Sequence, residues 1–372
     1  MEEKRNKNLF LIPGTAAYVF LLVATLLWAY WGVEEVFHEG WYPPYTQIIF
    51  YFVPLLALLG IITLCIYFPL IGGILIIAGG ILYLVLVVVR SRQQHINLLP
   101  SFWDISAIVV IPGLLFISDY ILKKRRKYSE PRRAVFKNRW KLVAAIGLSL
   151  ILIIGVGTPL LIRNLGRIPL DNYDEVTVEG NGITLTLAGD GPGWYYSNKS
   201  PIEFGGEEYR AFSWNEIALY GKDPVGFEGK RYGPDYDDTR DSIYYATQED
   251  FDRYNMFRYI NYEGNRLMDE VQDCWRLPAA EEYARLFMYR GKNCGGYFDS
   301  RKGKAYYNMT PDKEGPIWAP DKMVIYYWTS TSVDDEYAYD ITYSGEVRKI
   351  PKISRQDYRG WRAVKVGNKI KK

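Results

Sequence analysis

Histidine and cysteine, the side chains most often used for catalysis and metal binding, are scarce and unevenly placed in this chain. Both histidines, His38 and His95, precede residue 163, whereas Cys274 and Cys294 follow it. A domain formed after residue 163 would have no histidine as a general base or metal ligand, which excludes the commonest hydrolase and zinc sites. The two cysteines are a disulfide candidate if that domain faces an oxidising compartment. Whether they are oxidised stays open.

Aromatic and acidic side chains are the remaining candidates for a binding site. Asp334, Asp335 and Glu336 form an acidic run next to Tyr337. Clustered carboxylates are the ligands that calcium uses, although a solvated acidic loop is the alternative. Rigid aromatic rings supply the contact area of binding hot spots and of sugar stacking, and they also fill cores. We therefore expect no cofactor and no metal, with calcium as the one alternative.

The expected ligand site lies on the loops that flank Trp328. Its residues are Tyr306, Tyr307, Trp318, Asp334, Asp335, Glu336 and Tyr337. The aromatic rings would stack on a sugar or a peptide, and the carboxylates would orient hydroxyl or basic groups through charge-assisted hydrogen bonds. The alternative is an ordinary solvated loop over a core of tyrosines.

Long apolar runs precede residue 163, and none of comparable length follows it. A helix needs about 20 apolar residues to cross a bilayer. The segments that meet this length are residues 10–31, 47–68, 70–89, 103–122 and 142–162. We therefore expect residues 1–162 to form an all-α transmembrane bundle of about five helices, each crossing the lipid bilayer. Around Pro69 the pattern allows either a helix pair or one long broken element.

Basic residues indicate the orientation of this bundle. Ten Lys and Arg residues lie between Lys123 and Lys141, and the amino end is also basic. Short loops rich in Lys and Arg stay in the cytoplasm. The chain is therefore expected in the cytoplasmic membrane as a multi-pass protein, with a cytoplasmic amino terminus and an extracytoplasmic segment from residue 163 onward. The basic loop could also meet anionic lipid, but it is a topology signal rather than a sign of a nucleic-acid partner.

Few charged residues interrupt the apolar runs. Asp104 and Asp119 lie at opposite ends of the fourth run, where a carboxylate at headgroup level is the expected arrangement. This disfavours a secondary transporter. The Gly72-Gly73 and Gly79-Gly80 pairs predict close helix packing, which would serve either the bundle itself or a membrane partner.

The second half of the chain carries local signals of strands and short helices. After a juxtamembrane linker over residues 163–175, alternating apolar residues at 176–187 are joined through Asn181-Gly182, which predicts a hairpin. Ser213 and Glu216 have the spacing of a capping box, which predicts a helix start. Aromatic residues at helical spacing predict another helix from Thr247 to Tyr262.

Three motifs in the second half carry a family resemblance. They are Trp275-Arg276-Leu277-Pro278, Tyr327-Trp328-Thr329-Ser330-Thr331 and Gly360-Trp361-Arg362. Together they resemble the bacterial C-type-lectin-like domains, a superfamily that includes the Lcl-type carboxy-terminal domain and the formylglycine-generating-enzyme-like domains. The resemblance covers about residues 176–364.

The resemblance implies an α+β C-type-lectin-like domain over residues 176–372, with an insertion at about 221–273. It also implies that the motif residues are structural. These are Trp214, Trp275, Arg276, Leu277, Pro278, Trp328, Ser330, Thr331, Gly360 and Arg362.

Function does not follow from this resemblance, because the family's functions lie in variable loops. Its oxygen-dependent members need a late cysteine pair and its iron-dependent members need histidines, and neither is present after residue 294. We therefore expect no enzyme, but a membrane-anchored extracytoplasmic binding protein for a glycan or a protein ligand. The alternatives are a non-catalytic scaffold subunit of a membrane complex and an enzyme of the formylglycine-generating-enzyme-like superfamily, in which a carboxylate pair would have to act.

Overall fold

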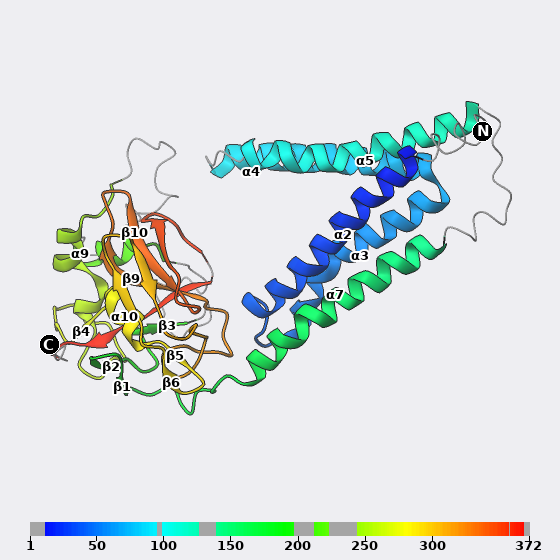
Figure 1. Cartoon of the computed structure of the whole chain (residues 1–372). Coiled ribbons are helices and arrows are strands. Elements are labelled where there is room, and N and C mark those ends of the chain that lie inside the picture. The colour runs from blue at the N-terminus through cyan, green and yellow to red at the C-terminus, as the bar shows by residue number, and fades with distance from the viewer. Residues whose placement is uncertain are drawn as a thin grey trace. The chain divides into compact units, whose positions relative to one another are not determined.

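The computed structural model describes residues 12–94, 99–125, 139–196, 212–222, 244–356 and 358–367. Its chain divides into two compact units. The helical unit comprises residues up to Phe37 together with Thr46–Ile162, and the β-rich unit comprises His38–Tyr45 together with Arg163–Lys372. Figure 1 shows long helices in the first and short strands in the second.

Long helices make up the described part of the helical unit. They are α2 (Ile12–His38), α3 (Ile48–Tyr67), α4 (Pro69–Gln94), α5 (Leu99–Arg125) and α7 (Arg139–Leu165), with the 3-10 turn η1 (Tyr45–Gln47) before α3. Among the described residues, three apolar helical segments, Pro13–His38, Tyr45–Tyr67 and Arg139–Leu165, are long enough to cross a membrane, and Pro69–Val85 is a shorter apolar segment. The choice left open at Pro69 is settled as two helices, because proline lacks a backbone N–H and is tolerated in the first turn of a new helix.

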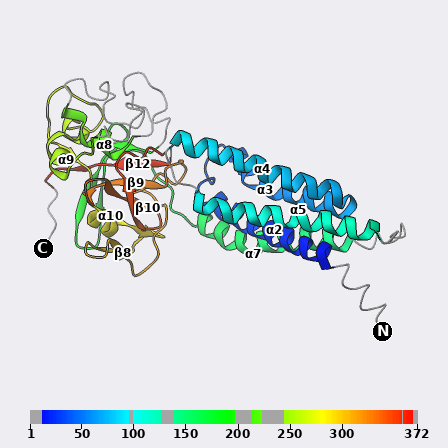
Figure 2. The same ribbon diagram turned by 90° about the horizontal axis from the view of Figure 1, so that it is seen from above.

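Glycines allow close contacts within the helical unit. Helices α4 and α5 lie side by side in both views (Figures 1 and 2), and a Cβ on Gly73 would lie 2.7 Å from the carbonyl oxygen of Gly113. A Cβ on Gly72 would lie 2.4 Å from the Sγ atom of Cys65. At Gly79, in contrast, a Cβ would meet no described atom within 4 Å. The first glycine pair therefore serves packing inside the bundle.

Asp119 differs from its expected exposed position. Its side chain is buried, it forms an ion pair of 2.9 Å with Lys123, and its carboxyl group would lie 2.7 Å from a Cβ on Gly14. The carboxylate therefore packs against the first turn of α2, and only a glycine fits opposite it. Asp104 lies among residues whose side chains the structure does not describe.

Two main sheets organise the described part of the β-rich unit. The first has the order β1-β2-β13-β4, and its strands are β1 (Val176–Glu179), β2 (Thr184–Leu187), β13 (Val364–Lys365) and β4 (Trp275–Arg276). The second has the order β11-β10-β9-β12-β3, and its strands are β11 (Val347–Pro351), β10 (Tyr337–Thr342), β9 (Tyr326–Ser332), β12 (Arg359–Arg362) and β3 (Trp194–Tyr195). Strands β9 and β12 are parallel, and the other pairs are antiparallel.

Short hairpins and helices complete the β-rich unit. The hairpins are β5 (Met288–Tyr289) with β6 (Lys292–Asn293), and β7 (Tyr297–Asp299) with β8 (Lys304–Tyr306). The helices are α8 (Trp214–Ala218), η2 (Tyr220–Lys222), α9 (Gln248–Tyr254), η6 (Met256–Tyr259) and α10 (Ala280–Leu286).

The local predictions for this unit are largely confirmed. Strands β1 and β2 pair through the Asn181-Gly182 turn, where Gly182 has a φ of 74°. The Ser213–Glu216 capping box starts α8. The helix predicted over 247–262 is shorter, because the backbone of Asn255 is extended and its side chain caps the following 3-10 turn.

The five-stranded sheet separates two hydrophobic cores. Side chains alternate along a strand, so Tyr327 and Ile341 join one core, while Trp328 and Ala338 join the other. Buried cations cover three of the buried indoles. Arg362 lies 3.5 Å from the ring centroid of Trp194, Arg359 lies 4.4 Å from that of Trp328, and Lys352 lies 4.9 Å from that of Trp214. These contacts offset part of the desolvation of each cation.

The predicted juxtamembrane linker is held by the rest of the β-rich unit. Asp312 is buried, and its carboxylate pairs with Arg163 at 2.8 Å and with Arg167 at 2.9 Å. The backbone N–H of Gly315 donates to the carbonyl oxygen of Ile168 at 3.2 Å. Residues 163–168 are therefore anchored and do not form a loose tether.

Candidate functional site

The acidic run forms the turn between β9 and β10. Asp334 accepts hydrogen bonds from the backbone N–H groups of Glu336 at 3.0 Å and Tyr337 at 2.9 Å. It also pairs with Lys349 at 2.5 Å, and this hydrogen bond lowers the pKa of Asp334. The Lys349 ammonium lies 4.2 Å from the Tyr337 ring centroid. Asp334 therefore shapes the turn, and all three carboxylates of the run are exposed.

The three aromatic residues expected at the site lie in different environments. Tyr306 lies on β8, where its ring stacks on Tyr297 with 5.3 Å between ring centroids. Tyr307 is half-buried against the core, and its hydroxyl donates to the carbonyl oxygen of Gly345 at 3.0 Å. Trp318 is fully buried and stacks on Tyr327 at 3.8 Å. The Trp318 ring is therefore a core element and not part of an exposed loop surface.

The acidic turn and the β7–β8 hairpin lie on one side of the five-stranded sheet. Phe298 of the hairpin packs edge-on against Tyr339 at 5.4 Å, and Tyr339 is the cross-strand partner of Lys349. Lys349 in turn pairs with Asp334. The structure thus brings Tyr306 and Asp334 onto neighbouring segments, although no direct contact between them is found among the described residues.

The motif tryptophans occupy buried structural positions. The indole N–H of Trp214 donates to Thr329, that of Trp328 to Phe212 and that of Trp275 to Asn261, each to a backbone carbonyl oxygen. Every one of these rings is buried. The bonds of Trp214 and Trp328 join segments more than a hundred residues apart in the sequence, as large rings with one polar atom are suited to do.

The other motif residues also have structural contacts. Arg276 and Glu282 form an ion pair of 2.6 Å, and the Ser330 N–H donates to the Pro278 carbonyl oxygen at 2.9 Å. Leu277 is buried, and Thr331 Oγ1 accepts from the Ala280 N–H at 3.4 Å. A Cβ on Gly360 would lie 2.0 Å from the carbonyl oxygen of Tyr195, so only glycine fits there. Arg362 is buried on Trp194.

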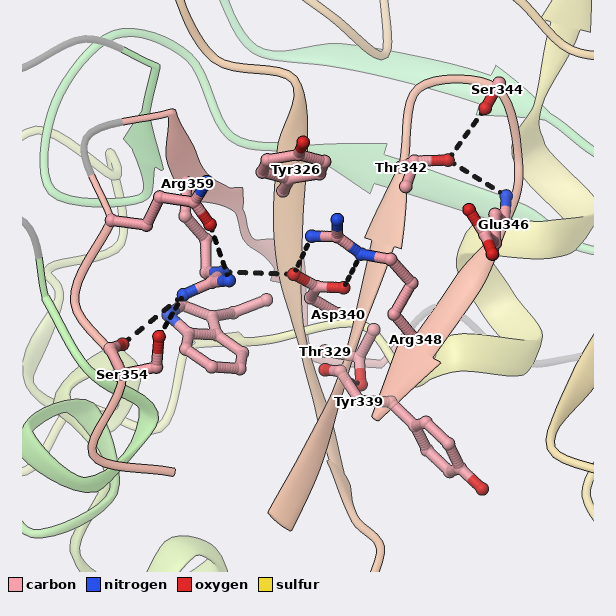
Figure 3. Close-up of polar contacts among 12 residues, drawn as sticks. Tyr326, Thr329, Tyr339, Asp340, Thr342, Ser344, Glu346, Arg348, Ser354 and Arg359 are labelled. Carbon is pink, nitrogen blue, oxygen red and sulfur yellow. Dashed lines mark hydrogen bonds and ion pairs between the residues drawn. The ribbon is translucent and has the colours of Figure 1, made fainter. Parts of the chain in front are cut away.

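A buried charge cluster lies at the centre of the five-stranded sheet (Figure 3). Asp340 on β10 is fully buried and faces Arg348 on β11, its register partner. Arg348 donates from Nε and Nη2 to the two carboxylate oxygens at 3.0 and 2.7 Å. Arg359 on β12 donates from Nε to the same carboxylate at 3.0 Å. One carboxylate therefore links three strands.

Both guanidinium groups of this cluster are held in place on aromatic rings. Arg348 lies 3.7 Å from the Tyr326 ring centroid, and Arg359 lies above Trp328. Burial alone would lower the pKa of Arg348, but its hydrogen bonds to Asp340 outweigh burial and raise it. For Arg359, burial prevails and lowers the pKa in spite of Asp340. Because the carboxylate already accepts three hydrogen bonds, the cluster is suited to holding strands together rather than to acid–base chemistry.

The candidate disulfide between Cys274 and Cys294 is not formed. Both thiols are free in the structure. Cys294 is fully buried in the core that contains Phe287, whereas Cys274 lies at the edge of the other core and donates to the Gln272 carbonyl oxygen. Burial raises the pKa of the Cys294 thiol to about 11, which makes it a poor nucleophile. The sheet between the two cores explains why the pair is not joined.

One histidine belongs to the β-rich unit, contrary to expectation. His38 is assigned to it, and its Nδ1 atom lies 3.0 Å from the Tyr343 hydroxyl. Its Nε2 atom lies 3.4 Å from the Tyr326 hydroxyl. The position of the histidines in the sequence therefore does not exclude a histidine as general base or metal ligand in this unit. Among the described residues, no group of three or more His, Cys, Asp or Glu side chains is arranged to hold a metal ion.

Sequence reasoning missed Tyr297, Asp340 and Arg348 as members of clusters. A signal existed for Asp340, because it occupies an inward position in an alternating strand, where a charge needs a partner.

Comparison with known proteins gives no match to a family model, a curated protein or a solved structure.

Proposed function

We propose that the chain is a multi-pass membrane protein that presents its β-rich unit outside the cell as a non-catalytic recognition module of C-type-lectin-like fold. The observation that carries this proposal is the stacked pair of the exposed Tyr297 and the partly buried Tyr306 on the β7–β8 hairpin. The motif tryptophans are buried, whereas Tyr297 is 50% exposed. Stacked rings at a rigid surface are suited to binding a ligand such as a glycan or a peptide.

The membrane topology that we propose has five spans. The three long apolar segments are supplemented by α4 and α5, whose lengths of 26 and 27 residues are sufficient for spans. An odd number of spans puts residues 1 and 163 on opposite sides of the membrane. The basic loop between α5 and α7 favours a cytoplasmic position for itself and for the amino terminus.

A cysteine-accessibility experiment tests this topology. Ser300→Cys is introduced into a Cys274→Ser background, because Ser300 is exposed and the other thiols, Cys65 and Cys294, are buried. Ser129→Cys in the basic loop is the matched control. We expect an impermeant maleimide to label position 300 in intact cells and position 129 only after permeabilisation. The reverse pattern would contradict the proposed topology.

Binding itself is tested with the full chain in nanodiscs on an array of neutral glycans, acidic glycans and peptides. Binding that is lost on Tyr297→Ala and Tyr306→Ala, and kept on Tyr262→Ala, would support the proposal. Tyr262 is a suitable control because it is 64% exposed in the same unit. No binding to any class on the array would contradict the recognition function.

A second candidate is a scaffold subunit of a membrane complex. Gly79 on α4, and Gly147 and Gly155 on α7, leave open space where a Cβ would be. Small residues on a lipid-facing surface allow another helix to approach closely. Stoichiometric copurification of a membrane partner, lost on Gly147→Leu and Gly155→Leu but not on Leu150→Ile, would favour this function.

A further inference from the structure

The turn of the β7–β8 hairpin is held in a defined conformation. Asp299 accepts hydrogen bonds from the backbone N–H groups of Arg301 at 3.1 Å and Lys302 at 3.3 Å. Gly303 has a φ of 62°, which favours glycine. A Cβ on Gly303 would lie 2.8 Å from the Tyr339 hydroxyl, so the turn also packs closely on the sheet.

The inner face of the same hairpin is fixed to the β-rich unit. The Phe298 ring packs against Tyr339, and the Phe298 N–H donates to the Glu281 carboxylate at 2.5 Å. Ala305 packs against the core. Because side chains alternate along a strand, Tyr297 and Tyr306 then point outward.

The outer face combines a stacked aromatic pair with uncompensated positive charge. Tyr297 and Tyr306 are cross-strand partners whose rings are inclined by 21°. Arg301, Lys302 and Lys304 are exposed beside them, against the single carboxylate of Asp299. Residues 297–306 thus carry three cations and one anion, a net charge of +2. The only ion pair of these cations among the described residues is Lys302 with Asp299 at 3.7 Å.

We infer that the outer face of this hairpin binds an acidic polysaccharide, an inference that rests on the recognition function proposed above. An exposed tyrosine ring stacks on the apolar face of a sugar ring. The guanidinium of Arg301 can bind a carboxylate in bidentate fashion, and Lys302 and Lys304 add point charges along a turn that is already ordered. A neutral sugar would leave the cations without partners, and an acidic peptide offers no sugar face to the rings.

Titration of the full chain with polygalacturonate tests this inference. The protein is held in nanodiscs of zwitterionic lipid, so that anionic lipid does not compete. We expect saturable binding that weakens between low and high salt, because exposed charges are screened. Neutral dextran and polyglutamate are the comparison polymers, and both are expected to bind much more weakly.

Two variants separate the charges from the rings. The triple variant should weaken polygalacturonate binding about tenfold, since each exposed ion pair contributes roughly 0.5 kcal/mol. It combines Arg301→Gln, Lys302→Gln and Lys304→Gln. Tyr297→Ala should weaken polygalacturonate binding without changing its salt dependence. Tyr297→Phe keeps the ring and should bind polygalacturonate as the parent does. Lys292→Gln and Tyr262→Ala, at exposed positions elsewhere in the unit, should leave it unchanged.

Each contrary outcome has a distinct meaning. Equal binding of polyglutamate and polygalacturonate, or full binding by the triple variant, would overturn the acidic-polysaccharide site. Tight binding of neutral glycans alone would overturn the ligand class and leave the recognition function standing. Unchanged thermal melting of each variant would show that a loss of binding does not come from unfolding.

Discussion

Asp340 and Arg348 lie directly opposite each other on β10 and β11, and two parallel hydrogen bonds join their side chains. Arg359 reaches the same carboxylate from β12. The carboxylate and Arg359 are buried, whereas the Arg348 side chain is 25% exposed. The sheet therefore depends on one anion to pair one buried and one partly buried cation.

Replacing Asp340 should be strongly destabilising. Asp340→Asn removes the negative charge and leaves the buried Arg359 guanidinium and the partly buried Arg348 guanidinium without a counter-charge, which costs about 3–5 kcal/mol of unfolding free energy. Chemical denaturation of the full chain in detergent measures this loss. Asp335→Asn, in the exposed turn, is the matched control and should change stability by less than about 0.5 kcal/mol. Equal effects of the two substitutions would contradict the structural role of Asp340.

Glycine-to-alanine substitutions should have opposite signs at two positions of the helical unit. Alanine favours helix by roughly 0.5–1 kcal/mol over glycine. At Gly60 a Cβ meets no described atom within 4 Å, so Gly60→Ala should raise the melting temperature. At Gly73 a Cβ would clash with the Gly113 backbone, so Gly73→Ala should lower it. Thermal melts in one detergent compare the pair, and a gain at both positions would argue against the close approach of α4 and α5.

Lys313 should make stability depend on pH in the alkaline range. Burial, helped by the charge of Arg167, lowers the pKa of this buried lysine to about 7 from an ordinary value of 10.5. Between these pH values the unfolded chain binds more protons than the folded one, so stability rises as pH rises through the window. Below pH 7 the amine is charged in both states and its burial is fully unfavourable.

Lys313→Met tests the role of this amine. The variant removes the charge at similar length, so it should be more stable than the parent at pH 7 and should lose the rise toward pH 10. Thermal melts from pH 6.5 to 10 measure both effects. Lys302→Met, at an exposed turn position, should keep the parental profile. A parental profile in the Lys313 variant would show that the buried amine does not titrate in this window.

Asp250 should contribute stability that is lost in acid. Burial alone would raise the pKa of this carboxyl, but hydrogen bonds from Tyr244, Thr247 and Lys222 outweigh it and lower the pKa to about 2. The folded state therefore binds fewer protons than the unfolded state between about pH 4 and 2, and stability falls as pH falls through that range.

Asp250→Asn should reduce the acid dependence and weaken the start of α9, where Asp250 completes the capping box of Thr247. Asp252→Asn on the same helix is the matched control, because Asp252 is exposed. Melting curves at pH 7 and at pH 3 measure how much stability each variant loses in acid. The assignment fails if the pH 7 to pH 3 loss is the same in parent and in Asp250→Asn.

The local features of this chain could be predicted from sequence because each depends on residues close together along it. The β1–β2 hairpin follows from alternation and an Asn-Gly turn, and the Ser213–Glu216 cap spans only three peptide units. The apolar runs of the first half likewise indicated helices, since run length alone decides whether a helix can cross hydrocarbon. The end of α9 was missed, because the Asn255 side chain caps the next turn and interrupts the aromatic pattern.

The tertiary structure alone decided which aromatic and charged residues are surface and which are core. Trp318 was expected at a binding loop but stacks inside the unit, while Tyr297 was overlooked and lies half-exposed on a hairpin. Asp312, Lys313 and Glu314 form a charged run that resembles a solvated loop in sequence, yet all three are buried. The ion-pair partners of Asp312, which are Arg163 and Arg167, lie more than a hundred residues away. Burial of a side chain depends on the segments that pack over it, and those segments come together only when distant parts of the chain fold against one another.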